Sequence, residues 1–253
     1  MKKVFLMILI VLVCVGSFQV FNNRPQSILM ELQKKDLLGA KRGIGLQYTV
    51  YFMGVVPMAN ILISQEDAGV YEGKDAIKMT MIAKPLSPLF DFYKGRVELV
   101  SLIDKKKEHA LKFSETIYEP SSINETREIF YDQEKHIIKA NNEERMMLPD
   151  TQDPLSMLHF LRSQDFKKGE VLDLNVNTNQ KNYRFLTKVD KKQSFSVNGT
   201  KVSAVSLEID IKRRNKTRRN STQMTVWLTN DDKNTPFLIK VFTSGLFLVL
   251  RLN

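Results

Sequence analysis

From residue 44 to the end of the chain, apolar residues alternate with polar ones in short runs, and this pattern restricts the fold more than any other feature. In the run 205–211 every odd-numbered residue is apolar and every even-numbered residue is polar. A period of two is typical of strands that bury one face of a sheet and expose the other. The closely spaced runs predict an antiparallel meander rather than βαβ units. The expected fold is mainly β: a curved antiparallel sheet of half-barrel shape, with a few short helices and an N-terminal leader helix.

The candidate strands fall into two sets. The first set is Ile44 to Phe52, Ala59 to Glu66, Ala76 to Ala83, Gly95 to Ile103, Ala110 to Tyr118, Thr126 to Tyr131 and His136 to Ala140. The second set is Val171 to Thr178, Asn182 to Asp190, Gln193 to Val197, Lys201 to Ile211, Thr222 to Thr229, Pro236 to Phe242 and Leu246 to Leu252. Turn-forming pairs such as Glu72-Gly73 and Asn198-Gly199 separate neighbouring runs. The sets form either two lobes or one continuous curved sheet, and we favour the continuous sheet.

Three segments have the character of helices: Ser27 to Arg42, Pro85 to Tyr93 and Asp153 to Gln164. The last is the best defined, because Asp153 is a typical cap residue and Pro154 fits the first helical position. Leu155, Leu158 and Leu161 would then form one apolar face. This helix lies between the two sets of strands, so we expect it to pack on the sheet.

The N-terminus has the pattern of an export signal. Lys2 and Lys3 precede an apolar run from Val4 to Val15, which matches the basic head and apolar body of a secretory signal. A membrane-spanning helix needs about 20 apolar residues, so cleavage is favoured over anchoring. We therefore predict a signal peptide or membrane anchor over 1–21, a helical linker over 22–43 and a single β-rich domain over 44–253. The protein is expected in the periplasm or otherwise outside the cytoplasm.

The cysteine content and the net charge restrict the chemistry further. Cys14 is the one cysteine and lies in the leader, so the mature chain would have neither a disulfide nor a thiol nucleophile. A lipid-modified cysteine is an alternative, but Val11 and Val13 stand where a leucine and a small residue are usual, so we favour an ordinary leader residue. The formal net charge is +10. In an exported protein this charge favours lipid headgroups or cell-surface polymers over nucleic acid as partners.

Several short segments, in this order and spacing, resemble the bacterial family called domain of unknown function 3108. They are Tyr48 to Gly54 with Ala59, Ser87 to Tyr93 with Val97 to Asp104, Asp153 to Ser156 with Leu161-Arg162, Gly169, Val226 to Asp232 with Pro236, and Gly245. The resemblance covers most of Gly45 to Leu252. It implies an exported envelope protein whose curved sheet is similar to those of the lipoprotein carriers LolA and LolB, which hold acyl chains on the concave side. The family has no established catalytic residues to transfer.

By this analogy, the concave side of the sheet is expected to bind a hydrophobic molecule such as a lipid or an acyl chain. The candidate ligand-binding residues are those of aromatic or two-faced apolar character: Trp227, Phe90, Phe92, Leu246 and Leu248. Trp227 stands on the mainly polar face of its strand, so a helix, a loop or a ligand must cover it. A covering helix is the favoured explanation, because large aromatic residues are mostly core residues.

A basic loop follows Ile211 and is the strongest chemical feature of the chain. Its charged residues are Lys212, Arg213, Arg214, Lys216, Arg218 and Arg219. Each basic residue near an anionic membrane contributes about 1 kcal/mol to binding, so the loop predicts contact with an anionic surface. A simple solvated loop that separates sheet edges is an equal alternative. The second functional hypothesis is accordingly a non-enzymatic interaction or assembly protein that docks through this loop.

No pattern in the chain indicates an enzyme, a metal site or a cofactor. His109, His136 and His159 lack the spacing of a helical zinc motif. Asp231 and Asp232 are adjacent acids, but aspartates are typical of turns. Serines lack a nucleophile-elbow pattern, and no phosphate-binding glycine loop is present. A hydrolase acting on envelope polymers stays open as a third hypothesis, since residues distant in sequence could converge.

Overall fold

The computed structural model of the chain describes residues 25, 28–29, 45–86, 95–118, 125–141, 143–178, 180–197, 200–214 and 222–253. One helix and fourteen strands make up most of this part. In chain order they are β1 Leu46–Phe52, β2 Val56–Tyr71, β3 Lys74–Pro85, β4 Arg96–Asp104, β5 Ala110–Tyr118, β6 Glu125–Asp132, β7 Ile137–Ala140, β8 Glu143–Met146, α3 Pro154–Ser163, β9 Val171–Thr178, β10 Lys181–Val197, β11 Thr200–Arg213, β12 Thr222–Thr229, β13 Pro236–Thr243 and β14 Leu246–Leu252.

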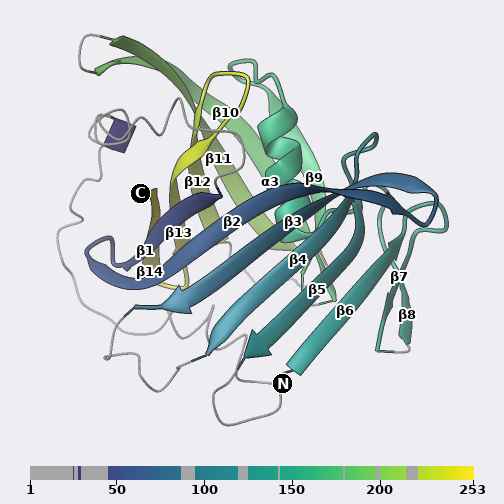
Figure 1. The fold of residues 1–253 in the computed structure, drawn as a ribbon. Helices are drawn as coiled ribbons and strands as arrows, with labels where there is room; N and C mark the ends of the chain where they lie inside the picture. The colour runs from purple at the N-terminus through teal and green to yellow at the C-terminus, as the bar shows by residue number, and fades with distance from the viewer. Residues whose placement is uncertain are drawn as a thin grey trace.

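All fourteen strands belong to one antiparallel sheet, in the order β8-β7-β6-β5-β4-β3-β2-β1-β14-β13-β12-β11-β10-β9. Neighbours in space are neighbours in sequence except at β1 and β14, where the two ends of the strand series pair. The strands before and after α3 thus form one continuous curved sheet, which confirms that prediction over two separate lobes. Figure 1 shows β1 to β6 as one limb and β9 to β13 as the other, with α3 where the limbs approach.

Helix α3 packs on one face of the sheet and so distinguishes an inner face from an outer face. It contacts β3 and β4 on one limb and β9 on the other. We call the face on which α3 packs the concave face, and the opposite face the convex face. The register places one row of residues directly opposite each other on the concave face: Val189, Leu207, Val226, Ile239, Leu250 and Val50. Side chains two positions along each strand share that face.

Both ends of α3 are fixed by polar side chains from other parts of the fold. Asp153 accepts hydrogen bonds from the Leu155 and Ser156 backbone nitrogens, and Ser156 Oγ accepts one from the Asp153 nitrogen. The Ser101 hydroxyl of β4 donates to Asp153 Oδ2 at 2.6 Å. At the C-terminus of α3, Asn234 Nδ2 donates to the carbonyls of Arg162 and Gln164. The cap and the proline predicted at 153–154 are confirmed, and both limbs hold the helix.

Several predicted boundaries differ from the structure. Asn182 to Asp190 and Gln193 to Val197 form the single strand β10, because a bulge between Val189 and Lys191 absorbs the polar break. Strand β8 was not predicted, because Glu143–Met146 is exposed throughout and carries no apolar alternation. Pro85 is the last residue of β3, and the remainder of the helix predicted over Pro85 to Tyr93 lies, from residue 87 on, outside the described residues.

Most of the predicted N-terminal features lie outside the described residues, including the leader, Cys14 and most of the helix predicted over 27–42. Ile28 and Leu29 are helical and fully buried in an apolar cluster that also contains Trp227 and Val249. Within the described ranges, none of the helices has the length and apolar character needed to cross a membrane.

Candidate functional site

The concave face changes character along the strands. Near α3 its side chains are buried: Leu207 and Leu228 are 0 % exposed, as is Met79 on the opposite limb. Toward the other end, where β11 ends and β4 and β12 begin, many residues of this face are partly exposed, although Leu246 is buried. Partial exposure already begins in the central row at Ile239 and Leu250, which are in register with buried Val226. We call this the far end of the concave face. Its partly exposed apolar residues are Ile61, Met81, Val97, Ile211, Met224, Ile239, Leu248 and Leu250.

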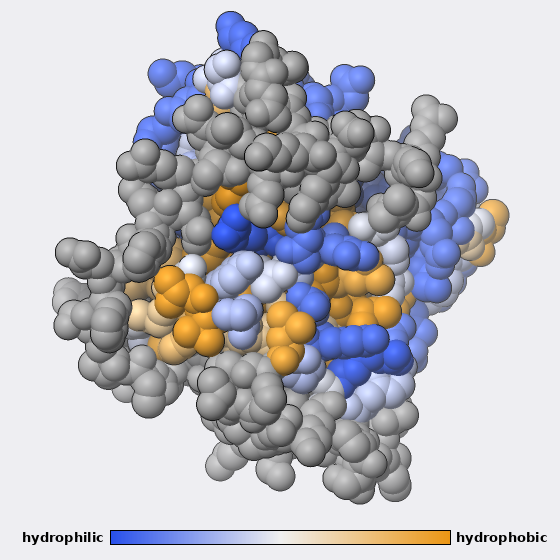
Figure 2. Space-filling model, turned by 60° about the vertical axis from the view of Figure 1, so that its left-hand side comes forward, coloured by the Kyte–Doolittle hydropathy of each residue, from blue (hydrophilic) through white to orange (hydrophobic). Residues whose placement is uncertain are grey.

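The far end is an apolar surface on an inner face, with residues from both limbs. Ile61 and Val97 flank Ala83 in the register, while Ile239 and Leu250 lie opposite each other on the other limb. Isolated apolar residues on an outer surface are common, but a row of them on the inside of a curved sheet is a typical wall of a ligand site. On the face of the molecule seen in Figure 2, apolar side chains lie interspersed with polar ones rather than in one unbroken patch.

The predicted ligand-binding residues divide between the two faces. Leu248 lies opposite Phe52 and Val241 on the concave face and is partly exposed, and Leu246 shares this face but is buried. Phe90 and Phe92 lie outside the described residues.

Trp227 lies on the convex face, so the structure does not bring it together with Leu248. It is opposite Ser206 and Leu238, whereas its neighbours Val226 and Leu228 pack in the cluster that contains Met157 and Leu161 of α3. Its ring is 6.0 Å from that of Phe195 and 6.5 Å from that of Phe237. Protein side chains therefore pack around the tryptophan, in the same cluster as helical Ile28 and Leu29.

The described residues of the basic loop are likewise divided between the convex and the concave face. Lys212 and Arg214 lie on the convex side of β11, where Lys212 pairs with Asp210 and Arg214 with Asp173. Arg213 lies on the concave side, opposite Tyr183. Lys216, Arg218 and Arg219 lie outside the described residues. Two of the three described cations therefore have acidic partners.

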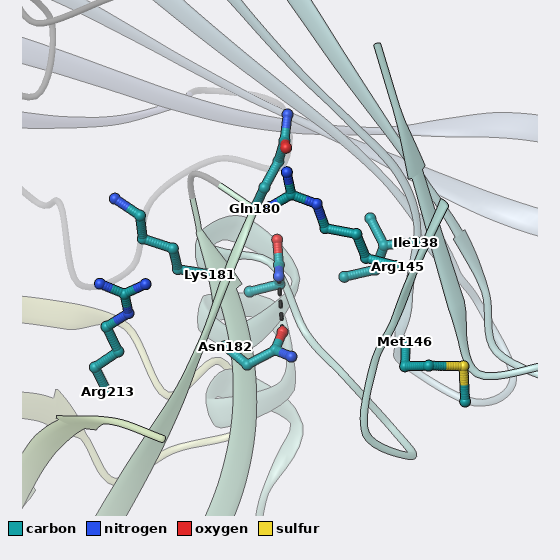
Figure 3. A pocket seen from close by; sticks show the side chains of 8 residues that line it. Ile138, Arg145, Met146, Gln180, Lys181, Asn182 and Arg213 are labelled. Atoms are coloured by element: carbon teal, nitrogen blue, oxygen red, sulfur yellow. Dashed lines mark hydrogen bonds between the residues drawn. The ribbon is translucent and has the colours of Figure 1, made fainter. Parts of the chain in front are cut away.

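A polar cavity of about 310 Å³ lies between the two edges of the sheet, and the sequence alone did not indicate it. Its described lining is Ile138, Arg145 and Met146 from β7 and β8, with Asn177, Gln180, Lys181, Asn182 and Arg213 from the limb of β9 to β11 (Figure 3). Asn177 Nδ2 donates to Asn182 Oδ1 at 2.8 Å. The cavity borders the point where the edges are joined, because Gln152 forms a bridge to Val176 and the backbone nitrogen of the lining residue Asn177 donates to the Gln152 carbonyl at 2.7 Å.

Two of the candidate acids and histidines, Asp231 and His109, are held by neighbouring groups of the fold. Asp231 Oδ1 accepts hydrogen bonds from Thr229 Oγ1 and from the Lys233 and Asn234 nitrogens, and so stabilises its loop. His109 is buried beside Asp104, and burial lowers the pKa of its imidazole. In the part of the chain that the structure describes, no group of three or more histidines, cysteines or acids lies close enough to hold a metal ion.

Asp153 gives the structure a pH dependence. Burial raises the pKa of its carboxyl to about 6, although the hydrogen bonds from Ser101, Ser156 and Leu155 act in the opposite direction. The native state therefore binds more protons than the unfolded state between about pH 4 and pH 6, and the unfolding free energy falls as the pH rises through this window. The contribution is on the order of 3 kcal/mol.

The variant Asp153→Asn should remove this contribution. Its amide oxygen can still accept from Leu155 and Ser156, and its nitrogen can donate to the Ser101 hydroxyl. We expect the change in unfolding free energy between pH 4 and pH 7, measured with urea, to shift by about 3 kcal/mol relative to the wild type. Asp232→Asn, in an exposed loop, is the control. Parallel pH profiles for Asp153→Asn and the wild type would contradict the assignment.

Comparison with known proteins identifies the family and supports the fold. Protein of unknown function (DUF3108) matches residues 47–245. A beta-barrel-like protein of the domain of unknown function DUF1849 from Brucella abortus has a similar structure, with a TM-score of 0.52, 8 % identity, and coverage of 83 % of this chain and 96 % of that one. A candidate exported protein with a YmcC-like fold from Bacteroides fragilis gives a TM-score of 0.30 and 7 % identity, over 84 % of this chain and 94 % of that one.

No curated protein matches the sequence significantly. The similarity to the Brucella protein concerns the fold alone, because so low an identity does not transfer function. The family match, in contrast, extends over most of the sheet, from β1 to the turn before β14. The chain therefore belongs to the DUF3108 family of proteins of unknown function.

Proposed function

We propose that this protein is a non-enzymatic binding protein of the cell envelope, exported from the cytoplasm, which holds a lipid or acyl chain against the far end of its concave face. The observation that carries the proposal is the gradient of burial along single strands. On β12, Leu228 and Val226 are buried against the α3 cluster, while Met224 on the same face is partly exposed. On β3, Met79 is buried and Met81 is partly exposed.

The fold explains why only one end of the concave face is available. Helix α3 fills the other end, and its caps at Asp153 and Asn234 attach it to β4 and to the loop between β12 and β13. A ligand at the far end would cover the apolar residues of the concave face that α3 does not cover. Each methylene moved from water to such a surface contributes about 0.8 kcal/mol, so a single acyl chain could bind without polar chemistry.

A direct test is to extract the purified protein with organic solvent, to analyse the extract by mass spectrometry, and to titrate the protein with a fluorescent fatty acid. We expect a co-purified lipid and saturable uptake of the probe with micromolar or tighter affinity. An empty extract together with no uptake would contradict the proposal. That result would favour the second hypothesis, an assembly protein whose basic loop contacts other envelope components.

A further inference from the structure

The far end of the concave face carries positive charge as well as apolar surface. We propose that the ligand is an anionic amphiphile, whose carboxylate or phosphate binds Arg145, Lys181 and Arg213 while its apolar chain lies on the far end. This inference rests on the proposed function and specifies the class of its ligand.

On two adjacent strands, the side chains of the concave face change in the same order, from buried to partly exposed and then to basic. On β11, Leu207 and Ile209 are buried, Ile211 is partly exposed, and the row ends at Arg213. On β10, the corresponding row passes from buried Val189, Thr187 and Phe185 to partly exposed Tyr183 and ends at Lys181. Tyr183 and Arg213 are direct partners in the register. Both rows thus change from apolar to basic in the same direction, as a ligand with an apolar chain and an anionic group requires.

The opposite limb adds a third cation across the seam. Arg145 of β8 lies opposite Ile138 of β7 and lines the same cavity as Lys181 and Arg213. Figure 3 shows the Arg145 side chain extending from its strand toward Gln180, with Lys181 and Arg213 on the facing limb. None of the described residues that line the cavity is acidic, and three are amides. Asn182 Oδ1 accepts from Asn177 Nδ2, and the side-chain nitrogen of Asn182 adds a further donor to the lining of the cavity.

The charges on the two faces of these strands are balanced differently. On the convex face, Lys212 pairs with Asp210, and Arg184 forms hydrogen bonds to both carboxylate oxygens of Asp173. On the concave face of the other limb, Arg127 pairs with Glu115 and Arg145 with Glu143, whereas Arg213 has no acidic partner within 4 Å among the described residues. A guanidinium in a partly enclosed cavity is stabilised by an anion, and its fork of donors suits carboxylate and phosphate groups. A bound headgroup would complete this site.

The test compares two probes that differ in charge alone, a fluorescent fatty acid and the corresponding fatty alcohol. The triple variant Arg145→Gln/Lys181→Gln/Arg213→Gln should bind the acid roughly tenfold or more weakly, and the alcohol within about twofold of the wild type. The matched control is Arg184→Gln/Lys188→Gln/Lys212→Gln, which removes the same charge from the convex face of the same region and should bind both probes as the wild type does. The single variant Arg213→Gln provides a milder change if the triple variant folds poorly.

The outcomes separate this inference from the proposed function. If wild type and triple variant bind both probes equally, the headgroup assignment is overturned while the acyl site stands. If the wild type binds neither probe, both proposals fail. Inorganic phosphate, titrated by calorimetry, distinguishes a headgroup from a free anion. Phosphate binding as tight as that of the fatty acid, and unaffected by the alcohol probe, would overturn the amphiphile in favour of a small-anion site.

Discussion

Replacing Leu161 with alanine should destabilise the protein by about 3 kcal/mol. Leu161 is 2 % exposed and packs from α3 into a cluster with Leu207 and Leu228 of the sheet. Its truncation leaves a cavity where helix and sheet meet, and the caps at both ends of α3 prevent the helix from moving to fill it. Urea unfolding followed by the fluorescence of Trp227, the one tryptophan, measures the effect.

The same experiment shows whether α3 and the sheet unfold together. Trp227 lies on the convex face and packs against the cluster that contains Leu155 rather than the one that contains Leu161, so it does not report on contacts with Leu161 directly. A lower midpoint with an unchanged slope is the expected result, because one continuous sheet carries both clusters. Val171→Ala is the control, since Val171 is 54 % exposed on the edge strand β9, and its effect should stay below about 0.5 kcal/mol. A separate, earlier transition that leaves the tryptophan signal intact would contradict a fixed helix.

The strands and the middle helix could be predicted because the residue patterns that specify each of them lie within the segment itself. The alternation in 205–211 reappears as buried and polar positions of β11, and Asp153 with Pro154 begins α3 as expected. Strand β8 could not be predicted in this way. Its backbone bonds to β7 form the strand, while its side chains bury nothing. Likewise, the polar residues around Asp190 suggested a strand end, but the partner strand continues and a bulge preserves the pairing.

The candidate site was only partly predictable, because it depends on which face is concave. The alternation places Trp227 and Val226 on opposite faces, and the structure agrees. The sequence does not say toward which face the sheet bends, since that depends on where α3 packs. The basic cavity needs the two sheet edges to meet, and Arg145 and Lys181 carry no local signal of that proximity. Arg213 did carry one, because it continues the apolar period of Ile209 and Ile211 rather than belonging with Lys212.

Leu248→Glu should strongly weaken acyl binding while leaving the fold intact. Leu248 lies on the concave face at the far end, opposite Phe52 and Val241, and is partly exposed. A carboxylate at this position must lose water when an apolar chain covers it. We expect the affinity for both the fatty acid and the fatty alcohol to fall about 100-fold, which corresponds to roughly 3 kcal/mol. The free energy of unfolding should change by less than about 1 kcal/mol, because the side chain already contacts water.

The matched control is Phe242→Glu, which introduces the same charge on the adjacent strand. Phe242 is 49 % exposed, and its position next to Val241 places it on the convex face. It should therefore bind both probes within about twofold of the wild type. The neutral alcohol is the decisive probe, because Leu248→Glu weakens its binding by desolvation whereas removal of the basic residues leaves it unchanged. If Leu248→Glu binds the alcohol as well as the wild type does, the chain of the ligand does not lie on the concave face, even if the protein binds lipid.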